Sequence, residues 1–534
     1  MVRRCLCVLL CVLGLRAQEA RVRILGTADL HGQVMAQDPF TLAPAPGGWA
    51  RTGALVRALK AQVPGALYVD CGDGIAGSPM AYVWSRMRPG RPGPVTATLN
   101  SLGATAMTVG HLELGWGFRQ IRALEEEARF PWLAANLRFA DTGKLAFTPY
   151  LKADVGGIQV AILGLVSRPR TTTPEIHEGL LIDDPVATAR EMVPLLRQKE
   201  KVDVVVVALH GGAGAACGND PESPAACLAE QVKGINLILA GHTGVQGAFA
   251  PAGVPTLQPG AGGQAVAVAD IALRRVRGRW EVASVDARLE KPAPDLPPDS
   301  AILEATAPGR ALADTYLDTF ATNLSTDLDG RWGRMEDTPL AHLLHTALRQ
   351  GTGAQVTAVP APPAWIFIPR GPTSVRQFYA LAPTEEAAAR IQVTGRQLRA
   401  YLEHAARFFN YSHLPELFNR QDGPGEFDTL EGVSYALDIS RAPGSRVVRL
   451  VSQGKEVKDD QTFTLGLPAR RLSGAGGYLE AMGWKGQVEA ITQESIRNLV
   501  LAQVLARPTL QVGTADTWRI IPALDRERVL AQQR

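Results

Sequence analysis

The chain has 534 residues, of which 46% are hydrophobic and 20% charged, and its formal net charge is +3. A single hydrophobic core rarely serves more than about 250–300 residues, so this length predicts two or three domains. The composition is typical of a folded globular protein and excludes a disordered, collagen-like or multi-span membrane protein.

The small positive charge arises at the N-terminus, where Arg3, Arg4 and Arg16 lie in a stretch that we expect to be removed. Without these three, the 55 Lys and Arg residues become 52, which equals the 52 Asp and Glu residues. A balanced mature chain offers no electrostatic reason to bind a nucleic-acid duplex or an acidic membrane.

The first 17 residues have the pattern of a secretory signal. A short basic region at Arg3 and Arg4 precedes an apolar run over 5–15, and small residues follow. We therefore expect a signal peptide at 1–20 and a periplasmic or secreted protein. No later run approaches the roughly 18 apolar residues of a membrane-spanning helix, so no membrane span is expected.

From residue 21 to about 289, short apolar, β-branched runs alternate with longer helical patterns. The runs that predict strands are 22–25, 66–69, 104–109, 158–165, 204–209, 235–240 and 266–273. Helical patterns between them include 52–61, 95–102 and 185–197. Apolar strands separated by helices are typical of an α/β layered domain, which we expect over 21–290.

A proline-rich stretch at 291–298 interrupts this pattern, since its four prolines cannot continue a helix or donate along a central strand. We expect a linker and connecting helix over 291–335, the helix covering 301–320. An α+β domain then follows over 336–534, opened by the helix start Thr338-Pro339. Its expected elements are a helix to about 349, a helix at 395–408, and strands near 433–439 and 447–451. We expect a monomer.

Three cysteines remain after removal of the signal. Cys217 and Cys227 bracket a polar loop that a disulfide can close in an oxidising compartment, which leaves Cys71 as an odd thiol. Spacing alone leaves the alternative of two unlinked cysteines open, because it does not establish bond geometry.

Histidines and carboxylates recur just after the predicted strands. In open α/β sheets these strand ends are where ligand sites form, because side chains of several loops converge there. A mixed set of imidazoles and carboxylates suits divalent Zn, Mn, Fe or Co, and one carboxylate can bridge two ions. The predicted metal ligands are Asp29, His31, Asp73, His111, His210 and His242.

These loops occur in the order found in the calcineurin-like metallophosphoesterases of the 5′-nucleotidase superfamily, which the chain resembles. Within that superfamily it is most similar to the 2′,3′-cyclic-nucleotide 2′-phosphodiesterase/3′-nucleotidase family. The supporting stretches are 23–31, 72–79, 426–435 and 471–478, so the resemblance extends over both predicted domains. It implies an N-terminal metallophosphoesterase domain and a C-terminal nucleotidase-like substrate domain.

The resemblance also implies roles for single residues. Asp29, His31 and Asp73 would hold one divalent ion, and Asp73, His111, His210 and His242 the other. His111 stands where the family has an asparagine ligand. Phe427 and Tyr478 occupy the places of two rings that stack on the nucleobase, and Arg471 would meet a phosphate or ribose edge. The alternative for these three is core packing and a surface charge.

Three positions depart from the family pattern. The family's catalytic histidine is replaced by Leu112, its orienting aspartate by Gly115, and a metal-binding histidine by Gly244. Glu113 cannot substitute for that histidine, because an ionised carboxylate repels an anionic transition state. No catalytic residue is therefore assigned.

The resemblance implies hydrolysis of nucleotide phosphoesters, either 2′,3′-cyclic nucleotides or nucleoside monophosphates, by attack of a metal-activated hydroxide on phosphorus. Losing a proton-transfer group costs roughly 10²–10⁴-fold in rate, so we expect slow turnover. Two alternatives stay open: a non-catalytic protein of the same fold that binds nucleotide or metal, and a metal-dependent hydrolase of a different ester.

Overall fold

The computed structural model describes residues 18–75, 77–87, 93–115, 117–168, 179–214, 216–419 and 426–532. Most of the predicted signal peptide falls on residues 1–17, outside this described part. Its last residues, Glu19 and Ala20, belong to the first strand, where they pair with Arg274 and Leu273. In the described part no helix combines the length and apolarity needed to cross a membrane.

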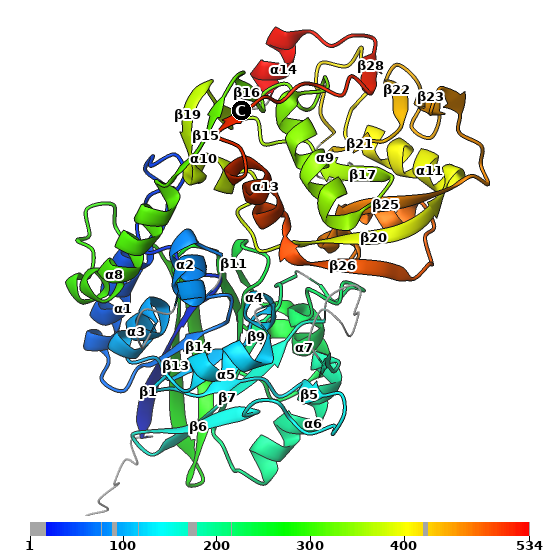
Figure 1. The fold of residues 1–534 in the computed structure, drawn as a ribbon. Coiled ribbons are helices and arrows are strands. Elements are labelled where there is room, and N and C mark those ends of the chain that lie inside the picture. Colours follow the sequence, from blue (N-terminus) through cyan, green and yellow to red (C-terminus); the bar gives the residue numbers. More distant parts are fainter. Residues whose placement is uncertain are drawn as a thin grey trace, which may run out of the picture.

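Two six-stranded sheets form the N-terminal part of the chain, which is the lower half of Figure 1. In spatial order, the first sheet contains β14 (Arg279–Glu290), β13 (Val266–Val276), β1 (Glu19–Thr27), β2 (Leu67–Asp70), β3 (Ala106–Thr108) and β4 (Trp132–Leu133). The second contains β11 (Gln246–Phe249), β12 (Thr256–Pro259), β10 (Leu237–Ala240), β9 (Val204–His210), β7 (Ile158–Val166) and β6 (Tyr150–Val155).

The sheets lie face to face because the central strands are apolar on both faces. One buried cluster contains Val22 and Val69 of the first sheet together with Ile162, Val206 and Leu239 of the second. Helices cover the outer faces: α1 (Trp49–Gln62), α3 (Pro94–Leu102) and α5 (Phe118–Glu125) on the first sheet, α6 (Pro185–Gln198) and α7 (Ala225–Gln231) on the second. The layered α/β architecture is confirmed, and the division into two sheets is a new finding.

Residues 291–299 form neither helix nor strand. Helix α8 (Ser300–Leu317) then begins at Asp299, whose side chain accepts a hydrogen bond from the Ile302 N–H. It packs beside α2 (Pro79–Met87) and α3, and a Cβ added at Gly309 would lie 2.9 Å from Pro94 Cγ. The predicted connecting helix is thus part of the N-terminal helical layer (Figure 1). The domain boundaries themselves stay predictions.

A five-stranded sheet organises the C-terminal part. Its order is β21 (Asp428–Glu431), β17 (Val356–Pro360), β25 (Thr462–Pro468), β20 (Ala387–Thr394) and β26 (Val488–Ser495). The period-two alternation of β20 directs Ala388 to the cluster with α9 (Pro339–Thr352) and Ala389 to the cluster with α11 (Gly395–Ala406). These helices therefore cover opposite faces. The expected strands near 433–439 and 447–451 are β22 (Ser434–Asp438) and β23 (Val447–Ser452).

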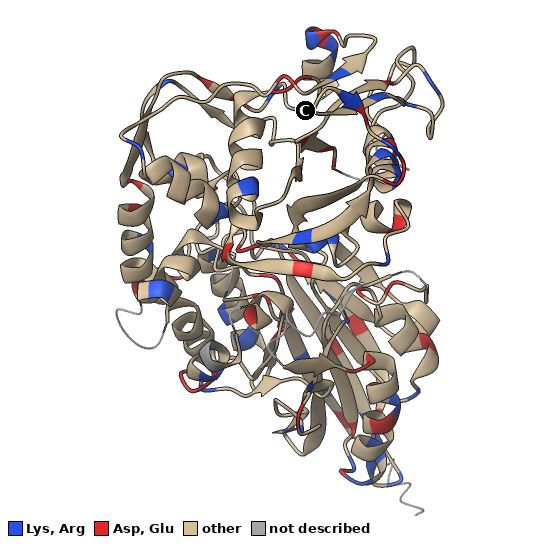
Figure 2. Ribbon diagram, turned by 45° about the vertical axis from the view of Figure 1, so that its right-hand side comes forward, with Lys and Arg blue, Asp and Glu red and all other residues tan. Residues whose placement is uncertain are grey.

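The two parts meet at an aromatic cluster. The Arg497 guanidinium of α13 (Ile496–Leu505) lies 3.9 Å from the ring centre of Tyr82 in α2 and 4.2 Å from that of Tyr379 in α10 (Val375–Tyr379). The Tyr82 hydroxyl also donates to Asn498. Because α2 follows the loop that carries Asp73, these contacts join the C-terminal part to the predicted metal site. Figure 2 shows both signs of charge interspersed over both parts.

Candidate metal centre

The predicted ligands lie at the carboxyl ends of neighbouring strands. Strands β1, β2 and β3 are parallel in one sheet, and β9 and β10 are parallel in the other, so their ends meet at one edge of the layered domain. Two overlapping groups have ligand atoms within 4.8 Å of one another: His111, His210 and His242, and Asp29, Asp73 and His210. Five of the six predicted ligands are thus brought together.

His31 belongs to neither group in the described part of the chain. Its backbone N–H donates to the Asp73 carbonyl, and Gly77 approaches its ring so closely that a Cβ there would lie 3.0 Å from His31 Nδ1. His31 is near enough that its charge contributes to lowering the pKa of His210. Its predicted role as a ligand stays a prediction.

The backbone around these ligands is unusual. Asp29, His31, Asp73 and His242 have φ angles of 51°, 52°, 53° and 76°, a region that residues with a side chain rarely adopt. Hydrogen bonds hold the loops against each other, including the Asp29 N–H to the Gly72 carbonyl at 2.9 Å. Such conformations persist where surrounding structure enforces them, often at functional sites. The donors are therefore positioned by the fold.

Backbone carbonyls select one tautomer for two of the histidines. His111 Nε2 donates to the Ser167 carbonyl at 2.9 Å, and His210 Nδ1 donates to the Cys71 carbonyl at 2.9 Å. The opposite nitrogens must then carry lone pairs. His111 Nδ1 lies 3.2 Å from His242 Nδ1, and His210 Nε2 is buried without a hydrogen-bond partner in the described structure. The lone pairs therefore face the cluster, as metal coordination requires.

Several carboxylates are buried beside these imidazoles. Burial raises the pKa of Asp29 and of Asp70 to about 7. Burial and a neighbouring carboxylate raise the pKa of Asp73 and of Glu113 to about 8. Asp29 Oδ2 has no hydrogen-bond partner in the described part of the chain. Uncompensated buried carboxylates are costly, and a divalent cation would reverse this penalty. This donor set fits divalent metal ions.

Glu113 supports the Asp73 loop. Its carboxylate accepts backbone N–H hydrogen bonds from Asp73 at 2.8 Å, Gly110 at 2.9 Å and Ile75 at 3.1 Å. Sequence reasoning did not predict this role. The signal was its position three residues after Gly110 at the start of α4 (His111–Leu114), because a glutamate there typically closes a capping box.

Leu112 contributes to the site through its backbone. Its N–H donates to Asp73 Oδ1 at 2.8 Å, whereas its aliphatic side chain cannot transfer a proton. The Asp73 carboxylate, a candidate metal ligand, is therefore held in place by the backbone of a residue whose side chain offers no acid or base.

Comparison with known proteins identifies the family to which this site belongs. Residues 22–246 match the family described as calcineurin-like phosphoesterase, and residues 316–483 match the 5′-nucleotidase C-terminal domain. This chain belongs to the 5′-nucleotidase family, with a calcineurin-like phosphoesterase domain on its N-terminal side. The predicted family and fold class are confirmed, and the family is one of phosphoric ester hydrolases.

Individual relatives are distant. The 2′,3′-cyclic-nucleotide 2′-phosphodiesterase/3′-nucleotidase of Salmonella typhimurium is 24% identical over 95% of this chain and 90% of its own length. The trifunctional nucleotide phosphoesterase YfkN of Bacillus subtilis is 23% identical, but the match covers only 39% of that protein. A putative 5′-nucleotidase from Staphylococcus aureus has a TM-score of 0.80 at 20% identity and covers 94% of this chain and 100% of its own.

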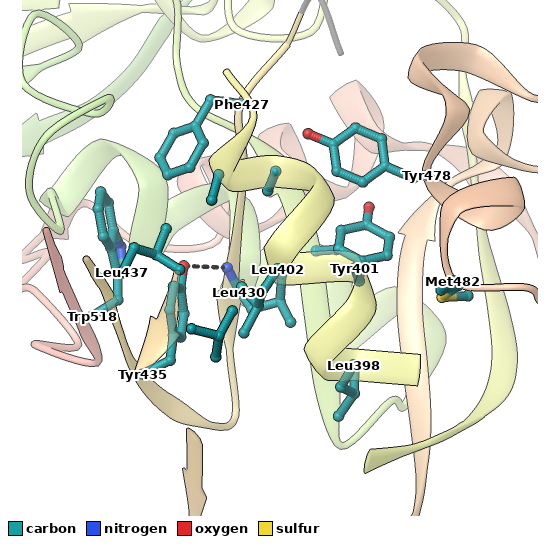
Figure 3. Packing of buried hydrophobic residues seen from close by; sticks show 14 of the residues in the cluster. Leu398, Tyr401, Leu402, Phe427, Leu430, Tyr435, Leu437, Tyr478, Met482 and Trp518 are labelled. Carbon is teal, nitrogen blue, oxygen red and sulfur yellow. Dashed lines mark hydrogen bonds between the residues drawn. The ribbon is translucent and has the colours of Figure 1, made fainter. Parts of the chain in front are cut away.

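The residues predicted to bind substrate in this 5′-nucleotidase family member are buried. Phe427 and Tyr478 are 2% and 0% exposed, and Figure 3 shows them packed with Trp518 and Tyr401 in the C-terminal core. The Arg471 guanidinium pairs with Asp428 and lies 4.5 Å from the Tyr478 ring centre. The structure places all three in a packed core rather than on an accessible surface. Their contact with a nucleobase or phosphate stays a prediction.

A disulfide joins Cys217 to Cys227, which are 10 residues apart, so the bridge left open by the sequence is present in the structure. Cys71 is a buried free thiol, as expected. The disulfide-closed loop lies beside the cluster, because the Gly212 N–H, two residues after His210, donates to the Glu222 carbonyl at 2.7 Å.

Proposed function

We propose that this protein is an exported, metal-dependent phosphoester hydrolase that acts on nucleotides, either 2′,3′-cyclic nucleotides or nucleoside monophosphates. One observation carries the proposal: the two groups of ligand atoms overlap at His210 and contain buried atoms, Asp29 Oδ2 and His210 Nε2, that have no hydrogen-bond partner in the described structure. Two divalent ions of Zn, Mn, Fe or Co would occupy these groups.

When bound, such ions neutralise charge on phosphoryl oxygens and lower the pKa of water. The protein's own residues would hold these ions and fix the orientation of the ligand side chains. The Leu112 N–H fixes Asp73 Oδ1, and Asp73 Oδ2 lies 3.5 Å from His210 Nε2, so Asp73 and His210 would hold an ion together with Asp29. Ser167 and Cys71 orient the imidazoles of His111 and His210. Leu112 supplies no proton to a leaving group, so we propose slow turnover.

The nucleotide class rests on the names of the relatives, which are 22–24% identical. The fold alone does not select the ester. A sulfate thiohydrolase, SoxB of Thermus thermophilus, has a TM-score of 0.59 to this chain at 20% identity. Substrate tests must therefore distinguish nucleotide hydrolysis from hydrolysis of a different ester.

The test is metal content and turnover of the purified mature chain. We expect up to two divalent ions per chain, together with chelator-sensitive hydrolysis of 2′,3′-cyclic AMP or a nucleoside monophosphate. The variant Asp73→Asn is expected to lose both. The matched control Asp154→Asn, on the distant strand β6, is expected to keep both.

Other outcomes are informative. Turnover of bis(p-nitrophenyl) phosphate without nucleotide hydrolysis would indicate a different ester. Nucleotide or metal binding without turnover would select a non-catalytic binding protein, the second candidate, which Leu112 favours. A metal-free protein that is indifferent to chelator would overturn the proposal.

Export is part of the same proposal. The N-terminal pattern over 1–17 and the Cys217–Cys227 disulfide support it, since structural disulfides are typical of oxidising compartments. Mass spectrometry of the mature chain from periplasm or culture medium, compared with cytoplasm, tests it. A full-length chain confined to the cytoplasm would contradict it.

A further inference from the structure

Glu222 lies on the loop that the disulfide closes, facing one of the clustered histidines. Its Oε2 is 4.0 Å from His242 Nε2, and the two side chains are 25% and 21% exposed. The loop position is well defined: the Gly212 N–H donates to the Glu222 carbonyl, and the Ala225 N–H donates back to the Gly212 carbonyl at 3.4 Å. A Cβ at Gly212 would lie 2.6 Å from Ser223 Oγ, so loop and strand end are in close contact.

The two nitrogens of His242 face different surroundings. Nδ1 faces His111 Nδ1 at 3.2 Å, on the side of the cluster, whereas Nε2 faces Glu222. In His111 and His210 the nitrogen directed away from the cluster donates to a backbone carbonyl. For His242 the carboxylate of Glu222 occupies the equivalent position.

A metal-bound imidazole normally donates its other N–H to a carbonyl or carboxylate, which fixes the tautomer and the ring orientation. The 4.0 Å separation exceeds a hydrogen bond, so the contact proposed here requires the partly exposed Glu222 carboxylate to move closer to His242. A proton on Nε2 leaves the Nδ1 lone pair directed at the cluster.

We propose that Glu222 is a positioning residue for the metal centre: it accepts a hydrogen bond from His242 Nε2–H, and the Cys217–Cys227 disulfide holds it there. The inference rests on the proposed metal site. It adds a residue outside the predicted ligand set and assigns a role to the disulfide.

The experiment measures metal affinity directly, by competition of Zn²⁺ or Co²⁺ with a chromophoric chelator, and the visible absorption of the Co²⁺ form. We expect Glu222→Ala to weaken binding about tenfold, at the lower end of the 10–100-fold range for such partners, and to alter the Co²⁺ spectrum. Glu222→Gln should lie between wild type and Glu222→Ala, because its amide oxygen accepts a hydrogen bond without charge. Glu191→Gln, on α6, is the control and should match wild type.

The disulfide is tested in the same assay. Replacing Cys217 and Cys227 by serine should weaken binding by a similar factor, and adding Glu222→Ala to that variant should produce no further loss, since both changes remove one interaction. Circular dichroism checks that each variant is folded. If the serine variant is not folded, the single Glu222 variants alone test whether Glu222 supports metal binding.

Two results would overturn the inference. One is a metal affinity of Glu222→Ala within twofold of wild type, with an unchanged Co²⁺ spectrum. The other is a metal affinity of the combined variant reduced by the product of the factors measured for the serine variant and for Glu222→Ala alone. If the wild-type protein itself binds no divalent metal, the proposed function fails together with this inference. If the wild-type protein binds metal and the Glu222 variants bind it equally well, only this inference fails.

Discussion

His210 Nδ1 donates a hydrogen bond to the Cys71 carbonyl at 2.9 Å, and this contact joins the two sheets of the metallophosphoesterase domain. Cys71 lies two residues before Asp73, whereas His210 ends strand β9 of the other sheet. The loop that carries Asp73 therefore also orients an imidazole from the opposite sheet. Substitutions in the Asp73 loop or in β9 are therefore expected to alter the positions of both groups of ligand atoms.

Replacing Glu113 by glutamine should loosen the Asp73 loop. An amide oxygen cannot reproduce two carboxylate oxygens that together accept three backbone N–H groups, and a buried unsatisfied donor costs about 1–3 kcal/mol. We expect the free energy of unfolding to fall by about this amount and metal affinity to weaken. Urea unfolding and metal titration measure both. The control is exposed Glu126→Gln, and equal stability of the two variants would contradict the role of Glu113.

Leu112→His combined with Gly115→Asp should restore proton transfer. Gly115 has φ −64°, and a Cβ there meets only the Leu112 carbonyl at 3.4 Å and the His111 carbonyl at 3.9 Å, so aspartate fits. We expect kcat for a nucleotide substrate to rise by about 10²–10⁴-fold. Leu112→Asn is the control without an acid or base. Absence of turnover in this variant, with intact metal binding, would instead favour a non-catalytic protein.

Gly244→His should strengthen binding of the divalent ion proposed near Asp29. A Cβ at Gly244 lies 3.6 Å from Ala261 Cβ, an ordinary contact, but φ of 66° strains any residue with a side chain by about 1–2 kcal/mol. Gly244→Ala carries the same strain without an imidazole and is the matched control. Calorimetric titration with Mn²⁺ or Zn²⁺ should show tighter binding for histidine than for alanine. Identical isotherms would place Gly244 outside the site.

The stability of the metal-free protein should decrease as pH rises from about 6.5 to 8. The raised pKa values of Asp29, Asp70, Asp73 and Glu113 mean that the folded state binds more protons than the unfolded state in this window, so stability falls with pH. Burial lowers the pKa of His210, and its opposing effect acts only below about 6.5, where unfolded histidine is protonated.

Thermal unfolding with chelator or with Zn²⁺ at several pH values measures this effect. The metal-free Tm should fall by several degrees between pH 6.5 and 8, since about 1 kcal/mol shifts the Tm of a domain of 150–250 residues by about 2–4 °C. The stabilisation by Zn²⁺ should grow over the same range, because the ion displaces protons from the carboxylates. A metal-free Tm that is flat or rises would show that these carboxylates are ionised throughout.

Tyr478→Phe should affect stability rather than substrate binding. The Tyr478 hydroxyl donates to the Glu426 carbonyl at 2.7 Å and accepts from the Asp428 N–H at 3.0 Å, while the ring stays packed. We expect a loss of about 1–3 kcal/mol in unfolding free energy and an unchanged KM. Tyr411→Phe in the same domain is the control. Unchanged stability with a changed KM would indicate that Tyr478 contacts substrate.

Much of the N-terminal fold was predictable because its signal is local. The runs at 204–209 and 237–240 are apolar at every position, which is typical of strands buried on both faces, and β9 and β10 lie there. The positions of the candidate ligands at strand ends were predictable for the same reason, since each follows such a run. What the pattern could not show is that the strands divide between two sheets, because pairing depends on partners far along the chain.

The residues that sequence reasoning missed or placed differently depend on distant contacts. Glu113 was considered only as a substitute acid, yet its carboxylate faces the Asp73 loop. Phe427 and Tyr478 match the family motif, but α11 and β22 pack over them and bury them. Glu222 had no recognisable pattern around it. Burial and orientation follow from packing by other elements, which a motif does not encode.

The sequence by itself determined which chemical groups are present and where they follow one another along the chain: imidazoles and carboxylates after successive strands, a leucine where a catalytic histidine is expected, and a cysteine pair close enough to form a disulfide. These features depend on residue identity and short-range periodicity, which the amino-acid sequence shows directly. Only the tertiary structure decided which nitrogen of each histidine faces the cluster, which carboxylates are buried, and where Glu222 lies. Those properties arise because residues of two sheets and a disulfide-closed loop, remote in sequence, exclude water and donate hydrogen bonds to one another.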